Sequence, residues 1–215
     1  MTAVLLLGAT GRTGAALLRH RPPNLRLYAG VRPGDGAQPP SVPERADDAR
    51  AIDLTDPARM RQALIGIDVV VNAIRLRGDI PQAALSDLHD RIVDAREGLS
   101  EPLIIHVGGA GALRMGGGRR FWQEPAFPAV TLPRGIAHAA LRDHLESEAR
   151  PRRWAYLIPP PSYRPEGRFT GGYRRRRPSD DEHDFARASI SYEDFALALA
   201  DAVRGRWTGT HLIST

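Results

Sequence analysis

The start of the chain carries a glycine-rich segment with the spacing of a dinucleotide-binding loop, Gly8-Ala9-Thr10-Gly11-Arg12-Thr13-Gly14. It follows an apolar run that predicts a strand and precedes a stretch that predicts a helix, which is the setting such a loop requires. Gly8 permits the tight turn, Gly11 lets the backbone approach a pyrophosphate, and Gly14 lets the helix pack on the sheet. Free N–H groups at the helix start would bind the phosphates. A glycine turn that binds nothing is the alternative, but the surrounding strand and helix favour dinucleotide binding.

The residues after the second predicted strand indicate which dinucleotide this would be. NAD-binding chains place an acidic residue about 20 positions beyond the loop to hold the ribose 2′-hydroxyl. Here the strand ends in Val31-Arg32, without an acidic residue. The Arg32 guanidinium can bind a 2′-phosphate through paired hydrogen bonds, and Arg12 can approach the same phosphate. The sequence therefore predicts NADP, with NAD as the alternative if Asp35 holds the ribose hydroxyls and Arg32 is solvated.

The composition excludes several kinds of chemistry. The chain of 215 residues has no cysteine, and all 30 of its basic residues are arginine. This excludes thiol catalysis, disulfides, thiolate metal sites, Schiff bases and the phosphate-loop lysine of nucleotide hydrolases. The histidines are scattered along the sequence without a metal-binding motif, so we expect no metal site. The net charge of +5 permits acidic partners, but arginine inflates the isoelectric point and nucleic-acid binding is not favoured.

Two segments, at about residues 108–132 and 159–188, are expected to hold an acceptor. They contain the aromatic side chains that are candidates to stack on a planar ring, Phe121, Trp122, Tyr163 and Phe169. Tyr163 is also a candidate catalytic residue. The alternative is that these aromatic side chains form the small hydrophobic core of two long loops. The run Arg174–Arg177 is either a solvated loop or a basic rim that attracts an anionic flavin phosphate or a carboxylated substrate.

Short apolar runs alternate with amphipathic segments along the chain, and these elements position the candidate residues. We expect strands at Val4–Leu7, Leu25–Val31, Ala51–Leu54, Asp68–Ile74, Leu103–Val107 and Trp154–Ile158, and an edge strand at His211–Ser214. We expect helices at Thr13–His20, 57–64 after an Asp56 cap, Pro81–Glu97, Pro133–Glu148 and 191–205. The segment Pro33–Arg50 is predicted to be a surface loop.

This alternation predicts an α/β fold, a single doubly wound domain of Rossmann type covering residues 1–215, with a parallel sheet and helices on both faces. The loops after the strand ends should line the ligand crevice. No apolar run approaches the roughly 20 residues that span a bilayer. The first residues lack the charged region of a signal peptide, so we expect a cytoplasmic protein.

Four segments resemble the atypical short-chain dehydrogenase/reductase family. They are the glycine loop, Val31-Arg32, Val107-Gly108-Gly109-Ala110-Gly111 and the pattern Ser-Ile-Ser-Tyr-Glu-Asp-Phe-Ala at 189–196. More closely, the chain is similar to NmrA-like bacterial proteins described as NADH-flavin reductases, relatives of the flavin and biliverdin reductases. The resemblance runs from Met1 to Thr215, and its motifs are specific for fold and cofactor rather than for substrate.

The resemblance implies a role for each matching position. The residues assigned to the pyrophosphate lie in the glycine loop: Gly8, Thr10, Gly11, Arg12 and Thr13. The adenosine half would be held by Arg32 at the 2′-phosphate, by Asp53 and Leu54 at the adenine, and by Ala73 beside the ribose. The nicotinamide would lie near Gly108, Gly109, Pro159 and Pro160.

The chain departs from the catalytic members of that family in the residues that would give a proton. Those enzymes use a tyrosine and a lysine four residues apart on the helix expected here at Pro133–Glu148, and this helix has neither. Arg134 and His138 have the same spacing, so His138 can replace the lysine by hydrogen-bonding the nicotinamide ribose; alternatively, both are surface residues. Reduced flavins and quinones exchange protons with water, so the missing pair points to such an acceptor or to no catalysis.

Two main hypotheses follow. The first is a reductase that transfers hydride from NADPH to a small planar acceptor, flavin- or quinone-like. The second is a non-catalytic NADP-binding protein that senses redox state and docks on a regulatory partner, as some NmrA-like proteins do. A dehydratase or isomerase that uses the cofactor only transiently is a third. No helix is clearly suited to docking, which favours the enzyme, and the chain can act as a monomer or a homodimer.

Overall fold

The computed structural model describes residues 1–32, 42–96, 98–99, 101–147 and 153–215. Its centre is an eight-stranded sheet in the order β3-β2-β1-β4-β5-β6-β10-β8. The strands are β1 Thr2–Leu7, β2 Leu25–Val31, β3 Asp48–Ala51, β4 Val69–Asn72, β5 Leu103–Val107, β6 Trp154–Ile158, β8 Arg174–Arg176 and β10 Gly209–Ser214. Only the pair β10 and β8 is antiparallel. A smaller parallel sheet joins β7 Ser162–Arg164 to β9 Ser189–Ser191.

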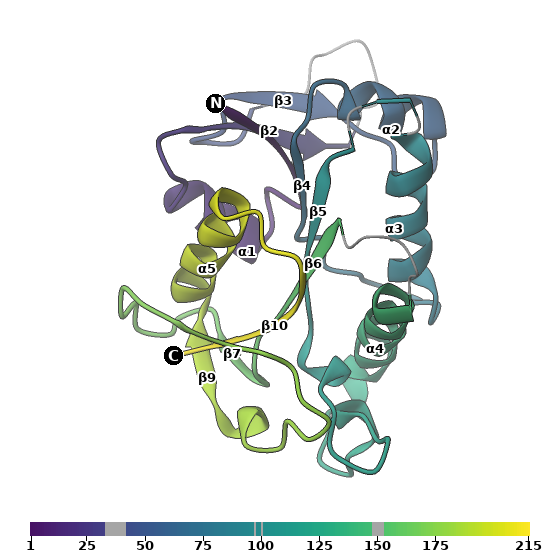
Figure 1. Ribbon diagram of the computed structural model, residues 1–215, viewed down its shortest axis with the longest axis vertical. Coiled ribbons are helices and arrows are strands. Elements are labelled where there is room, and N and C mark those ends of the chain that lie inside the picture. Colours follow the sequence, from purple (N-terminus) through teal and green to yellow (C-terminus); the bar gives the residue numbers. More distant parts are fainter. Residues whose placement is uncertain (33–41, 97, 100, 148–152) are drawn as a thin grey trace.

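Helices cover both faces of the large sheet (Figure 1). One face carries α1 Arg12–Arg19 and α5 Tyr192–Arg204, and the other carries α2 Pro57–Leu64, α3 Ala84–Ala95 and α4 Leu132–Ser147. This arrangement confirms the predicted α/β, doubly wound architecture. The strand order reverses between β1 and β4, the point at which sheets of this kind form a ligand crevice beyond their carboxyl ends. No helix among the described residues is long and apolar enough to cross a membrane.

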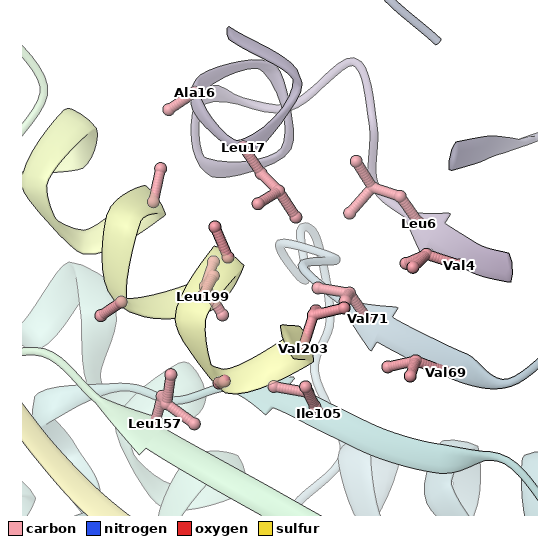
Figure 2. Packing of buried hydrophobic residues seen from close by; sticks show 14 of the residues in the cluster. Val4, Leu6, Ala16, Leu17, Val69, Val71, Ile105, Leu157, Leu199 and Val203 are labelled. Atoms are coloured by element: carbon pink, nitrogen blue, oxygen red, sulfur yellow. The ribbon is translucent and has the colours of Figure 1, made fainter. Parts of the chain in front are cut away.

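Alternate residues of each strand feed the two hydrophobic layers, because side chains along a strand point to opposite faces. Val4 and Leu6 of β1 pack with α1 and α5 (Figure 2), whereas Leu5 and Leu7 pack with α2 and α3. All four side chains are at most 1 % exposed. An apolar run therefore marks a strand buried on both faces, which is why the central strands were predictable from sequence.

The third strand lies three residues earlier than predicted, at Asp48–Ala51 instead of Ala51–Leu54. It is an edge strand whose four residues are exposed or half-buried, so it has no apolar pattern to mark it. The apolar residues that suggested a strand, Ile52 and Leu54, follow its end. The Ile52 N–H donates to Val31 O at 2.8 Å, and the chain then turns into α2.

The last strand, β10, was predicted to form an edge of the sheet, and this prediction is wrong. It lies between β6 and β8, and residues 174–176 of the arginine run form the antiparallel edge strand β8 instead of a solvated loop. Charged side chains are common on edge strands because they prevent pairing with another chain. The Arg175 guanidinium also stacks over the Trp207 ring at 4.1 Å.

Helix starts follow the predicted capping residues in two of the helices. Asp56 accepts hydrogen bonds from the backbone N–H groups of Ala58 and Arg59 at the start of α2, and Ser191 caps α5 through the N–H of Asp194. These side chains replace partners that the first turn of a helix lacks. The helix expected from Pro81 begins three residues later, at Ala84.

Candidate functional site

The glycine loop joins β1 to α1 at the carboxyl edge of the sheet, directly beside the end of β4. Gly8 has φ of +80°, and a Cβ there would lie 2.6 Å from the Ala73 carbonyl oxygen. A Cβ at Gly14 would lie 2.2 Å from the Gly8 carbonyl oxygen. Both positions therefore require glycine for backbone packing. At Gly11 the only close atom is Gly8 O at 3.1 Å, so this position borders open space and is available to a ligand.

The amino end of α1 has the features of an anion site. Gly11 occupies the cap position without a side-chain hydrogen bond, and the first turn contains no acidic residue. The first N–H groups of a helix lack intrahelical acceptors and lie at its positive end. The side chains of Thr10 and Arg12 are exposed beside them. Three of the residues predicted to bind pyrophosphate thus lie next to unpaired backbone donors.

Arg32 and Asp53 lie at neighbouring strand ends, since β2 ends at Val31 and Ile52 bonds to its carbonyl oxygen. The Arg32 side chain is exposed and makes no ion pair with a described residue. The Asp53 carboxylate instead accepts hydrogen bonds from the Thr55 N–H and hydroxyl at 2.9 and 2.7 Å, and these lower its pKa. Arg32 is therefore free to bind a phosphate, whereas Asp53 shapes the turn before α2. Asp35, the alternative ribose ligand, lies outside the described residues.

Two cavities flank this nucleotide half. One of about 230 Å³ is bordered by Ala9 and Thr10 of the glycine loop and by residues 43–45. A larger one of about 550 Å³ lies between α2 and α3 and includes Leu54, the residue predicted to contact adenine. The larger cavity is not lined by any residue of the glycine loop, so its size does not show where the cofactor binds.

The other end of the crevice is built by the loops after β5 and β6. Gly108 is buried and donates its N–H to Leu157 O at 2.7 Å. A Cβ at Gly109 would lie 2.5 Å from the His138 ring of α4. Pro159 and Pro160 follow β6 and are buried. The structure thus brings the predicted nicotinamide residues and His138 to the ends of two adjacent parallel strands.

His138 is a neutral imidazole whose hydrogen-bond roles are fixed by Tyr156. The Tyr156 hydroxyl donates to the His138 carbonyl oxygen at 3.0 Å, so His138 Nδ1–H donates to that hydroxyl at 3.1 Å. Burial and, to a smaller extent, the charge of Arg134 lower the pKa of His138 to about 4. Near pH 7 its Nε2 is therefore an acceptor, suited to a sugar hydroxyl and unable to act as a cationic acid.

Tyr163 contacts the glycine loop instead of presenting a free ring. Its hydroxyl lies 2.9 Å from the Thr13 hydroxyl, and its ring stacks on Tyr192 with centroids 3.8 Å apart. Burial raises the pKa of Tyr163 well above its usual value. One ring face is thus covered and the phenol holds its proton, so Tyr163 links β7 to the start of α1.

The structure separates the four aromatic residues proposed to hold an acceptor ring. Phe121 and Trp122 pack with Phe127 above Gly135 of α4, inside the loop after β5. Phe169 stacks on His20 at the far end of α1, with centroids 4.9 Å apart. Its placement in the acceptor wall is therefore wrong: the long loop after β6 carries it past the crevice.

The structure adds Arg75 to the candidate residues of the crevice and links it to Arg134, which the sequence had singled out only as a partner of His138. Arg75 lies three residues beyond β4, and Arg134 lies in the first turn of α4. Burial and the charge of Arg75 lower the pKa of Arg134, which Tyr192 opposes. The sequence offered one signal for Arg75, its position after a strand end, but nothing that paired it with Arg134.

Three histidines that looked scattered in sequence are neighbours in space. Asn72 accepts the Ile74 N–H, so its amide NH₂ donates to His106 Nδ1 at 3.2 Å, and His106 Nε2–H donates to His89 Nδ1 at 3.0 Å. Burial lowers the pKa of His106 well below its usual value. His89, Asp90 and His144 offer ligand atoms within 4.8 Å of one another. The hydrogen bonds from Asn72 through His106 to His89 Nδ1 form a buried chain beside this group.

Comparisons with known proteins agree with this geometry. Residues 8–205 match a protein family described as NAD(P)H-binding. The fold is similar to a Streptococcus pneumoniae protein named "putative NADH-flavin reductase", with TM-score 0.73, 22 % identity and coverage of 100 % of this chain and 99 % of that one. A Bacteroides thetaiotaomicron protein named "putative epimerase" matches with TM-score 0.77 and 23 % identity, over 99 % of this chain and 96 % of that one. A Burkholderia pseudomallei protein named "putative exported protein" matches with TM-score 0.76 and 24 % identity, over 100 % of both chains. No curated protein matches the chain.

Proposed function

This chain belongs to the NAD(P)H-binding family, and we propose that it is a reductase that transfers hydride from NADPH to a flavin- or quinone-like planar acceptor. The observation that carries the proposal is the uncapped, acid-free start of α1 at the glycine loop, with Arg32 exposed at the next strand end. A fold shared with a protein named as an NADH-flavin reductase supports it. We place the activity in one cytoplasmic domain, residues 1–215, acting as a monomer or homodimer.

The residues present fit the cofactor along the whole crevice. The backbone at Gly8, Gly11 and Thr13, with Thr10 and Arg12, would hold the pyrophosphate, and Gly14 keeps α1 close to the sheet. Arg32 would bind the 2′-phosphate, with Asp53, Leu54 and Ala73 around the adenosine. Gly108, Gly109, Pro159 and Pro160 would border the nicotinamide. Bound NADPH would supply the hydride.

The side chains around the nicotinamide region orient the cofactor and do not donate protons near neutral pH. His138 presents Nε2 as an acceptor for a ribose hydroxyl, since its Nδ1–H is held by Tyr156. Tyr163 fixes Thr13 and keeps its own proton. An acceptor that takes its proton from water, such as a flavin or quinone, suits this site better than a ketone, whose reduction needs a nearby acid.

The same observation keeps a second function open. Neither His138 nor Tyr163, the two candidate proton donors, gives a proton near pH 7. Such a site also suits a non-catalytic protein that binds NADP and reports the redox state to a partner. Such a protein would bind both redox forms of the cofactor and turn over no acceptor.

The decisive experiment follows NADPH oxidation against flavins, quinones and small carbonyl compounds, with calorimetric binding of NADPH as the reference. We expect turnover with flavins or quinones and none with simple ketones. Tight NADPH binding without turnover of any acceptor would instead support the sensor. Turnover of ketones alone would contradict the assignment of the acceptor class.

A further inference from the structure

Two arginines at the carboxyl edge of the sheet, Arg75 and Arg134, make no ion pair with a described residue. Arg75 lies in the loop after β4, two residues beyond Ala73, which touches Gly8. Arg134 lies in the first turn of α4, and the next residue, Gly135, packs against Gly111 of the loop after β5: a Cβ at Gly111 would lie 2.4 Å from Gly135 Cα. Because β4 and β5 are adjacent and parallel, both arginines come from the same edge of the sheet.

Neither guanidinium has an ion-pair partner among the described residues. The charged or titratable groups that act on Arg134 are Arg75 and Tyr192, and burial adds to the effect of Arg75 in lowering its pKa. Arg75 is exposed and Arg134 is half-buried, so both guanidinium groups can be reached by a ligand, and their like charges repel each other. An anion between them would remove this repulsion and accept hydrogen bonds from both.

Other arginines of α4 and of the loop before it are paired with carboxylates, in contrast to Arg75 and Arg134. Arg114 bonds Glu146 at 2.6 Å, and Arg142 bonds Glu182 at 2.8 Å. Carboxylates are therefore plentiful around α4, yet none of those in the described part of the chain pairs with Arg134 at its amino end. Arg75 and Arg134 at the crevice thus make no ion pair with a described residue, whereas Arg114 and Arg142 are neutralised by glutamates.

The pair lies on the acceptor side of the nicotinamide region. Arg134 precedes His138 by one helical turn, and its charge acts on the His138 ring, which packs against Gly109. The predicted phosphate ligands, by contrast, lie at the glycine loop and at Arg32. The position of Arg134 therefore suits a group carried by the acceptor better than a phosphate of the cofactor.

We propose that Arg75 and Arg134 form an anion subsite that binds a phosphate or carboxylate of the planar acceptor. This inference rests on the proposed function and narrows it, because it selects acceptors with an anionic side group. Arginine is suited to such a subsite because its planar guanidinium forms paired hydrogen bonds with both kinds of anion. Tyr192, stacked on Tyr163, borders the same subsite.

The test compares ligands that share a ring and differ in charge: FMN with riboflavin, and a carboxylated with an unsubstituted naphthoquinone. Binding is measured by fluorescence quenching on the NADP⁺-loaded protein, so that it does not depend on turnover. The variants are Arg75→Gln and Arg134→Gln. Arg187→Gln is the matched control, since Arg187 is exposed, has no ion-pair partner among the described residues and ends a short helical turn before β9.

We expect the wild-type protein to bind the anionic member of each pair more tightly. Each crevice variant should weaken that member about 10- to 100-fold, the range of a lost charge-assisted hydrogen bond. The neutral members and NADPH should change less than twofold, and Arg187→Gln should change nothing. Raising the salt concentration should weaken only the anionic ligands.

Two results would overturn the subsite. One is equal binding, or no binding, of the charged and neutral members of both pairs. The other is a loss of NADPH affinity in Arg75→Gln and Arg134→Gln as large as the loss for FMN, which would assign the pair to the cofactor. Charge-selective binding without any NADPH oxidation would support the subsite and contradict the reductase, so the two claims fail separately.

Discussion

Arginines at the carboxyl edge of the sheet and arginines around the body of α4 differ in what neutralises them. The first group, called here the crevice arginines, consists of Arg12, Arg32, Arg75 and Arg134, which have no ion pair with a described residue. The second group, the α4 arginines, consists of Arg114, Arg120 and Arg142, which pair with Glu146, Asp143 and Glu182. Arginine is thus paired with carboxylates around α4 and without an ion pair to a described residue in the crevice, where we propose that it binds ligands.

The contrast follows from what each region has to hold. Arg142 and Glu182 are completely buried, and a buried charge requires a permanent partner within the protein. Glu182 lies in the segment before β9, so this ion pair fastens that segment to α4. The crevice arginines Arg12, Arg32 and Arg75 are exposed, so water solvates their charges and they do not need a permanent partner within the protein. An unpaired arginine at a strand end is therefore a better indicator of a ligand site here than the net charge of the chain.

The largest effect is expected at the glycine loop, where Gly11→Val should abolish NADPH binding. The new side chain would fill the space that Gly11 leaves open beside the first N–H groups of α1. The fold should survive, because the nearest atom to a Cβ there is Gly8 O at 3.1 Å. Calorimetry and a thermal melt measure both outcomes.

Gly14→Val is the comparison for this variant. Its Cβ would lie 2.2 Å from Gly8 O, so we expect the melt itself to lose cooperativity or to shift strongly. A Gly11→Val protein that unfolds as Gly14→Val does would show that Gly11 is needed for structure instead of binding.

In the α4 region, Glu182→Gln should destabilise the protein by up to about 3–5 kcal/mol, because it removes the buried carboxylate that binds two Arg142 nitrogens and leaves Glu146 as the described carboxylate on that buried charge. Chemical unfolding measures this difference in the free energy of unfolding. Arg204→Gln, which breaks the exposed pair with Asp201, is the control and should cost less than about 1 kcal/mol. A Glu182→Gln protein as stable as this control would contradict the structural role of the α4 arginines.

Arg32→Ala should weaken NADPH binding by about 1.5–3 kcal/mol, or roughly 10- to 100-fold, since it removes a charge-assisted hydrogen bond to the 2′-phosphate. NADH affinity should change little, and stability should not change because Arg32 makes no ion pair with a described residue. Parallel titrations of both cofactors check this. Equal losses for NADPH and NADH would remove Arg32 from the 2′-phosphate.

His138→Ala should have a smaller effect, raising the KM for NADPH about two- to tenfold, the range of one neutral hydrogen bond. The expected change is in KM more than in kcat, because His138 Nε2 holds the ribose and transfers no proton. Steady-state kinetics with a saturating acceptor separate the two parameters. A large fall in kcat with normal NADPH binding would make His138 a proton donor.

The smallest change is expected in the pH profile of turnover between pH 6 and 8. The pKa of His138 is lowered to about 4, so its charge does not change in this range. Stability behaves differently: the folded state keeps His138 and His211 neutral down to about pH 4, while the unfolded chain takes up protons near pH 6.5. The free energy of unfolding should therefore be constant above about pH 6.5 and fall as the pH drops toward 4. A rate that changes steeply near pH 6.5 would contradict the lowered pKa.

The parts of the site that could be predicted from sequence are those built within one strand–turn–helix unit. The glycine loop, Arg32 after β2 and Gly108 after β5 are fixed by their position behind an apolar run. The edge strand β3 was predicted three residues too late, and β8 was not predicted as a strand, because an exposed edge carries no apolar pattern.

The parts that could not be predicted depend on contacts between distant segments. Tyr163 meets Thr13 across 150 positions, and Arg75 and Arg134 come to the same edge of the sheet because β4 and β5 are neighbours. Phe169 has the right residue type for stacking on a ring, but the path of its loop takes it to His20. Residue type predicted which interactions a side chain could make, whereas the fold determined which other residues it meets.

The most direct test of the central claim is calorimetric titration of the wild-type protein with NADPH and with NADH at two salt concentrations. We expect one site per chain, with NADPH bound at least about tenfold more tightly than NADH and with the difference shrinking as salt screens the crevice arginines. Equal affinities for the two cofactors, or no binding of either, would contradict the claim that these arginines are unpaired because they bind the anions of a cofactor and its acceptor.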